Sequence, residues 1–90
     1  ITFNKNIQFT RLLKVHGRLR EFNFRKANAH ANGVFTVDVL DEESPMGNRI
    51  IFKMELKDNE WKIVTNGLPI WVLEKEAALQ EIIAEELSTN

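Results

Sequence analysis

The sequence predicts an α+β fold, in which an antiparallel β-meander of about five strands is followed by a single C-terminal α-helix packed on one face. Apolar residues recur close to every second position up to about Val64 and then follow helical spacing. Short segments rich in turn-forming residues separate the alternating stretches. A chain of 90 residues with an ordinary apolar fraction fits one domain, so residues 1–90 are expected to form a single domain.

The alternation places five strands, and their boundaries follow from the turn-forming segments. The expected strands are 7–15, 18–26, 34–40, 49–57 and 60–65. The clearest pair is the hairpin 49–65, because Asp58 and Asn59 both tolerate the positive φ of a two-residue turn. In its expected register Leu56 faces Trp61, Met54 faces Ile63, Phe52 faces Thr65, Lys57 faces Glu60 and Glu55 faces Lys62.

The first hairpin, 7–26, has two registers that the sequence leaves open. A two-residue turn at His16-Gly17 places Phe9 opposite Phe24 and Arg11 opposite Phe22. A three-residue loop instead places Leu12 opposite Phe22 and Thr10 opposite Phe24. Neither register gives a clean apolar face, so we expect this hairpin to twist beyond the helix.

The C-terminal helix begins after Gly67-Leu68-Pro69, since proline fits the first turn of a helix. Its apolar stripe consists of Trp71, Val72, Leu79, Ile82, Ile83 and Leu87. Glu85 and Glu86 near its end oppose the helix dipole. A basic neighbour would relieve this conflict, and the arginines of the first two strands are the candidates, from the same chain or from a second copy.

Charge is unevenly divided along the chain, although the net charge is only −1. Residues 1–35 carry seven basic side chains and one acidic side chain, whereas residues 36–90 carry five basic and twelve acidic ones. Such asymmetry is typical of a binding surface, or of two halves that attract each other within the fold.

The sequence gives no reason to expect an enzyme. It has no phosphate loop, no nucleophile elbow and no metalloprotease motif, and nothing brings the histidines His16 and His30 to Ser44 or Ser88. The acidic cluster at the end of the third strand lacks calcium-loop spacing and is expected to be solvated; it comprises Asp38, Asp41, Glu42 and Glu43. We therefore expect no catalytic residue, no cofactor, no metal site and no small-molecule substrate.

The candidate site is the segment Gly17–Lys26, which mixes basic and large apolar side chains. Strand parity puts Arg18, Arg20, Phe22, Phe24 and Lys26 on one face. Exposed, these residues would form a nucleic-acid platform, extended by Arg11 and Lys14. Buried, the two phenylalanine rings would belong to the core, and the heads of Arg18 and Arg20 would lie in water at its edge. Burial tendencies favour the core interpretation.

A third interpretation starts from apolar residues on both sides of the first hairpin, which are Leu12, Leu13, Val15 and Leu19. A half-exposed hairpin would be buried by packing against a second copy, and Ile51 and Val64 on the outer side of the last hairpin also lack cover. The first hypothesis is thus a non-enzymatic protein-interaction module that binds a protein partner, including a second copy, through the first hairpin. The alternative is a sequence-tolerant nucleic-acid-binding protein.

The compartment is inferred from composition. The chain has no cysteine, no apolar run near the ~18 residues of a membrane span, and no signal-peptide pattern at its start. We expect a cytoplasmic protein without membrane contact.

Overall fold

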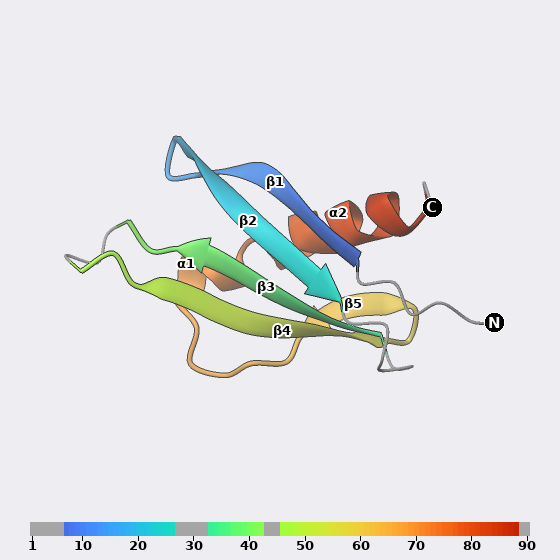
Figure 1. The fold of residues 1–90 in the computed structure, drawn as a ribbon. Helices are drawn as coiled ribbons and strands as arrows, with labels where there is room; N and C mark the ends of the chain where they lie inside the picture. The colour runs from blue at the N-terminus through green and yellow to red at the C-terminus, as the bar shows by residue number, and fades with distance from the viewer. Residues whose placement is uncertain (1–6, 27–32, 43–45, 89–90) are drawn as a thin grey trace.

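The fold is a five-stranded antiparallel meander followed by a helical layer (Figure 1). The computed structural model describes residues 7–26, 33–42 and 46–88. The sheet order is β1-β2-β3-β4-β5, with bounds β1 Ile7–Val15, β2 Arg18–Lys26, β3 Val34–Leu40, β4 Arg49–Lys57 and β5 Glu60–Ile63. The predicted α+β class is confirmed, and only the last strand ends earlier than expected. His30, Glu43 and Ser44 lie outside the described residues.

Two tight turns set the registers of the two outer hairpins. His16 and Gly17 have φ of 50° and 79°, and Asp58 and Asn59 have φ of 51° and 66°. Positive φ at both central residues is the type I′ geometry that matches strand twist. The first hairpin therefore takes the two-residue turn, with Phe9 opposite Phe24. In the last hairpin Leu56 pairs with Trp61 and Lys57 with Glu60, as predicted.

The expected C-terminal helix consists of two helical segments, α1 (Ile70–Leu73) and α2 (Glu76–Ser88). A turn at Glu74 and Lys75 separates them, where the Lys75 N–H donates to the Val72 carbonyl three residues back, at 3.0 Å. The predicted apolar stripe continues across both helical segments. Its buried members are Trp71, Val72, Leu79, Ile82 and Ile83.

Helix α2 reaches from one edge of the sheet to the other. At its start, the Ile63 N–H of β5 donates to Glu76 Oε2 at 2.9 Å. At its end, Glu85 and Glu86 contact Arg11 of β1. Thirteen residues at about 1.5 Å each give a length of about 20 Å, and four gaps of about 4.8 Å separate the two edge strands by about 19 Å. One helix of this length is thus enough to cover one face of the sheet.

The core lies between α2 and the covered face of the sheet, here called the inner face. Its aromatic side chains form a row across the strands: the ring centres of Phe9 and Phe24 are 4.7 Å apart, those of Phe9 and Phe35 5.9 Å, and those of Phe35 and Trp61 5.1 Å. Stacked and edge-to-face pairs of this kind add about 0.5–1.5 kcal/mol each to the burial of the rings. The row therefore ties β1, β2, β3 and β5 together.

Gly33 provides a test of this packing. A Cβ at Gly33 would lie 2.7 Å from Cη2 of Trp61 and 3.3 Å from Cβ of Leu56, and the Trp61 ring is already held by Phe35. We expect Gly33→Ala to lower the free energy of unfolding by about 1–3 kcal/mol, the usual cost of overpacking. Urea denaturation measures this. In a Trp61→Phe background the smaller ring leaves space and the cost should shrink, so an equal cost in both backgrounds would contradict the packing.

Candidate interaction surface

Phe22 and Phe24, the centre of the predicted basic and aromatic strand face, belong to the core. Both are fully buried. The parity prediction is right, since Arg20 is buried on the same side of β2 as the two rings, but that side is the inner face beneath the helical layer. The core interpretation is confirmed, and neither ring is accessible for base stacking.

Arg20 is also buried, with only 5% of its surface exposed. Its guanidinium carbon lies 5.0 Å from the ring centre of Trp71. The prediction that the head of Arg20 lies in water is wrong, because α1 brings Trp71 over this end of β2, where a cation–π contact forms. Arg18 is exposed as predicted, with its NH1 3.8 Å from Glu42 Oε2. Lys26, at the other end of β2, is half-buried.

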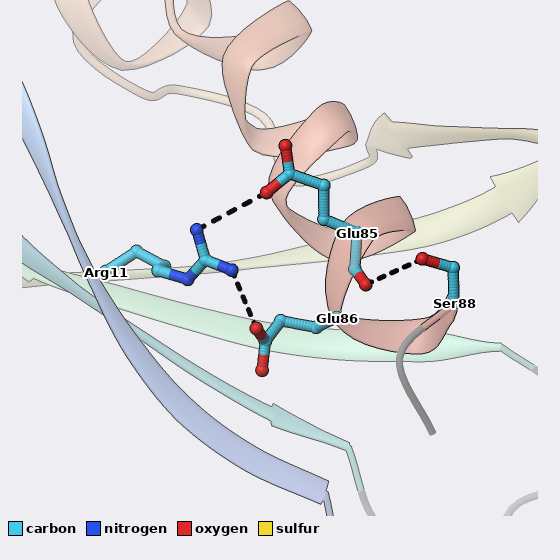
Figure 2. A network of polar contacts seen from close by, with 4 residues as sticks. All are labelled: Arg11, Glu85, Glu86 and Ser88. Carbon is cyan, nitrogen blue, oxygen red and sulfur yellow. Dashed lines mark hydrogen bonds and ion pairs between the residues drawn. The ribbon is translucent and has the colours of Figure 1, made fainter.

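Arg11 lies between β1 and the last turn of α2 (Figure 2). Its NH2 donates to Glu86 Oε2 at 2.7 Å, and its NH1 lies 3.5 Å from Glu85 Oε1. The hydrogen bond to Glu86 raises the pKa of the guanidinium above its usual value, and the charges of both carboxylates add to this. The predicted basic neighbour of the helix end is therefore Arg11 of the same chain.

The uncovered side of the sheet, here called the open face, carries most of the exposed side chains of the first hairpin. Lys14 lies there, opposite Leu19 in the register. Leu12, Leu19 and Ile51 are 56%, 61% and 56% exposed, and Leu40 is 38% exposed. Leu13 and Val15 point to the inner face instead, where Val15 is buried, so the expectation that they are half-exposed is wrong for Val15.

A chain of hydrogen bonds crosses the open face. The Thr10 hydroxyl donates to Asn23 Oδ1 at 2.7 Å, and Asn23 Nδ2 donates to Asp38 Oδ1 at 3.0 Å. Arg49 NH1 donates to the same oxygen at 2.6 Å, and Arg25 NH2 lies 3.9 Å from Oδ2. These contacts link β1, β2, β3 and β4. Sequence reasoning missed this chain, because its residues meet only once the β1–β2 and β2–β3 registers are known.

Asp38 is buried, with 7% of its surface exposed, so the expectation that it is solvated with the acidic loop is wrong. The alternation of β3 turns it onto the open face, where Arg49 and Asn23 bind it. Asp41 and Glu42 follow β3, and Asp41 is half-buried whereas Glu42 is exposed. Within residues 7–26, 33–42 and 46–88, no three histidine or acidic side chains are placed to hold a metal ion.

Strands β2 and β3 diverge toward the start of β2 (Figure 1), and a hollow lies at this place on the surface. Pairing of β2 with β3 begins only at Phe22 and Val39, so residues 18–21 extend past β3. The hollow is lined by Arg20, Glu21, Asn23, Leu40, Glu42 and Arg49. Leu40 is one of these lining residues. Leu12 of β1 and Leu19 of β2 lie on one side of the hollow, and Ile51 of β4 lies on the other side. The open face thus has a hollow lined mainly by polar side chains, with exposed aliphatic side chains on either side of it.

The two sides of the molecule differ in charge. Away from the β4–β5 hairpin, where Glu55 pairs with Lys62 and Lys57 with Glu60, the open face carries four cations and three carboxylates. The cations are Lys14, Arg25, Arg49 and Lys53, and the carboxylates are Glu21, Asp38 and Glu42. The outward side of the helical layer carries the exposed carboxylates Glu74, Glu81 and Glu85. The charge asymmetry of the sequence thus becomes a basic open face and an acidic helical layer.

Comparisons with known proteins give no relative: no family model, no curated protein and no solved structure matches the chain significantly. None of the helices within the described residues has the length and apolar character needed to span a bilayer.

Arg11 should hold the end of α2 against β1. We expect Arg11→Gln to speed amide hydrogen exchange in the last turns of α2, because Glu85 and Glu86 lose their cation at the negative end of the helix dipole. Added salt should reduce the difference from the wild type, since exposed charges are screened. Arg18→Gln is the matched control and should leave α2 unchanged. Equal exchange in wild type and Arg11→Gln would contradict this role.

Asp38 should stabilise the sheet, because its hydrogen bonds connect β3 to β2 and β4. We expect Asp38→Ala to cost about 1–3 kcal/mol in unfolding free energy, because the half-buried Asn23 amide and the Arg49 guanidinium lose their acceptor. Thr10→Ala removes only the exposed end of the same chain of bonds and should cost less. Chemical denaturation of both variants checks this, and a larger loss for Thr10→Ala would be inconsistent with it.

Proposed function

We propose that this chain is a non-enzymatic, cytoplasmic protein-interaction module that binds a protein partner through the open face of its sheet. The observation that carries the proposal is the position of the exposed aliphatic side chains. Of the eight large hydrophobic residues that are exposed among the described residues, four lie on this one face, and they are Leu12, Leu19, Leu40 and Ile51. A concentration of this kind, with charged residues around it, is typical of a protein-binding surface.

The character of the open face favours protein over nucleic acid as the partner. Single-stranded nucleic acids bind to exposed rings on which bases stack, with cations along the backbone. The rings of Phe22, Phe24, Phe35, Phe52 and Trp61 are buried in the core. The four cations of the open face lie among aliphatic chains and are partly neutralised by Glu21 and Asp38. Such a mixed surface suits the apolar centre and polar rim of a protein interface.

Two further observations support a binding role rather than catalysis. His16 lies in the exposed turn between β1 and β2, where a positive φ is required. Ser88 donates its hydroxyl to the Glu85 carbonyl at the end of α2. The backbone of His16 and the hydroxyl of Ser88 thus each have a local structural role, in a turn and at a helix end.

The proposal predicts that partner capture depends on the open face. Tagged wild type and a Leu12→Ser/Leu19→Ser variant are expressed in the native cell and cross-linked, and the bound proteins are quantified. We expect proteins captured by the wild type to fall at least tenfold with the variant, which replaces exposed residues and should fold normally by circular dichroism. Met46→Ser, which changes a more exposed apolar residue in the connection between β3 and β4, is the control. Identical capture by all three would contradict the proposal.

A second measurement separates protein from nucleic acid as the ligand class. Labelled single-stranded RNA and DNA are titrated with the chain and followed by fluorescence anisotropy. We expect at most weak binding that disappears at moderate salt, because only phosphate contacts are available. Tight binding that persists at moderate salt would favour the nucleic-acid alternative.

A further inference from the structure

We propose that the partner of the open face is a second copy of this chain, seated by its helical layer, so that copies associate head to tail. This inference rests on the proposed function and names the occupant of the surface. The two sides of the molecule that would meet carry exposed aliphatic residues and opposite charge, and both are present on every copy.

The outward side of the helical layer carries exposed aliphatic residues together with negative charge. In α1, Ile70 is 74% exposed and Leu73 48% exposed, one helical turn apart on the same side. Glu74, Glu81 and Glu85 continue outward along the following turn and α2. The outward side of the helical layer is therefore aliphatic at its start and acidic along its length.

The open face matches this pattern with the opposite sign. Its aliphatic residues lie around the hollow between β2 and β3, and its cations lie beside them. Lys14 is opposite Leu19 in the register, and Lys53 is two residues from Ile51 on the same side of β4. The aliphatic residues of α1 can be buried against this face while the carboxylates of α2 meet its cations, which gives both apolar burial and charge complementarity.

The charges also determine the kind of symmetry. Two open faces brought together would place one net positive surface against another, and two helical layers would place one net negative surface against another. Like charges across an interface are unfavourable. The contact between unlike faces is therefore preferred. A head-to-tail pair keeps one unused open face on one copy and one unused helical layer on the other, so association does not stop at a dimer unless a ring closes.

The open face is large enough for such a contact. The five strands have 9, 9, 7, 9 and 4 residues, and at about 3.3 Å per residue and about 4.8 Å between strands they give an area of about 600 Å². A standard stable interface buries about 800 Å² on each partner. An association that uses most of the open face thus falls near the lower end of stable interfaces, and we expect it to be concentration-dependent.

The test uses two variants that each block one face without changing net charge. Leu19→Ser/Ile51→Ser blocks the open face, and Ile70→Ser/Leu73→Ser blocks the helical layer. Sedimentation velocity is measured from micromolar to millimolar concentration. The wild type should rise beyond twice the monomer mass of 10.5 kDa, and each variant alone should remain monomeric. An equal mixture of the two variants should form a one-to-one dimer and nothing larger, because only one unblocked face of each kind remains.

One control variant and a change of salt concentration accompany this test. Met46→Ser should associate like the wild type, and salt should weaken the association. A wild type that stays monomeric throughout, a mixture that stays monomeric, or a dimer that persists in the helical-layer variant would overturn the head-to-tail contact. If association fails while cellular capture still depends on Leu12 and Leu19, the open face binds a different protein and only this inference is lost. If both fail, the proposed function fails as well.

Discussion

The structure depends on the burial of one face of a five-stranded sheet beneath a helical layer that consists of the short α1 and the 13-residue α2. The aromatic row from Phe9 to Trp61 is part of the core on the sheet side, and Trp71, Val72, Leu79, Ile82 and Ile83 belong to it on the helical side. The helix is just long enough to reach from β5 to β1, and polar contacts fix both of its ends. One helix covers one face, so the other face has no cover from the described part of the chain.

The division of charge follows from this arrangement. Strands β1 and β2 carry most of the positive charge of the first third of the chain. Arg20 contacts Trp71 and Arg11 contacts the end of α2, so two of these arginines have partners within the fold. The cations that remain on the open face are mixed with aliphatic side chains. On the helical layer Glu74 and Glu81 are exposed, and Glu85 is exposed beside Arg11. Two chemically different faces on one small domain are what a binding module needs, and they are the basis of both proposals.

Much of the fold could be predicted from the sequence, because strand alternation and turn chemistry are local. The Asp58-Asn59 turn and the register of its hairpin followed from residues next to one another. The burial of Phe22 and Phe24 followed from their size. The positions of Arg20 and Asp38 did not follow, since each depends on a residue distant in the sequence: Trp71 for Arg20, and Asn23 and Arg49 for Asp38. The face of β2 that was considered for nucleic-acid binding is the one that the helical layer covers, and the sequence alone does not say which side of the sheet the helix covers.

The most direct test of the account is carbene footprinting of the native chain at low micromolar concentration, with the labelled residues read by mass spectrometry. The account places Leu12, Leu19 and Ile51 in solvent and Phe22 and Phe24 beneath the helix. It therefore predicts strong labelling of the three aliphatic residues and no labelling of the two rings until the chain is unfolded. Labelling of Phe22 and Phe24 at the level of Leu12 and Leu19 would mean that the helix does not cover the inner face, and would contradict the assignment of the binding surface to the other side.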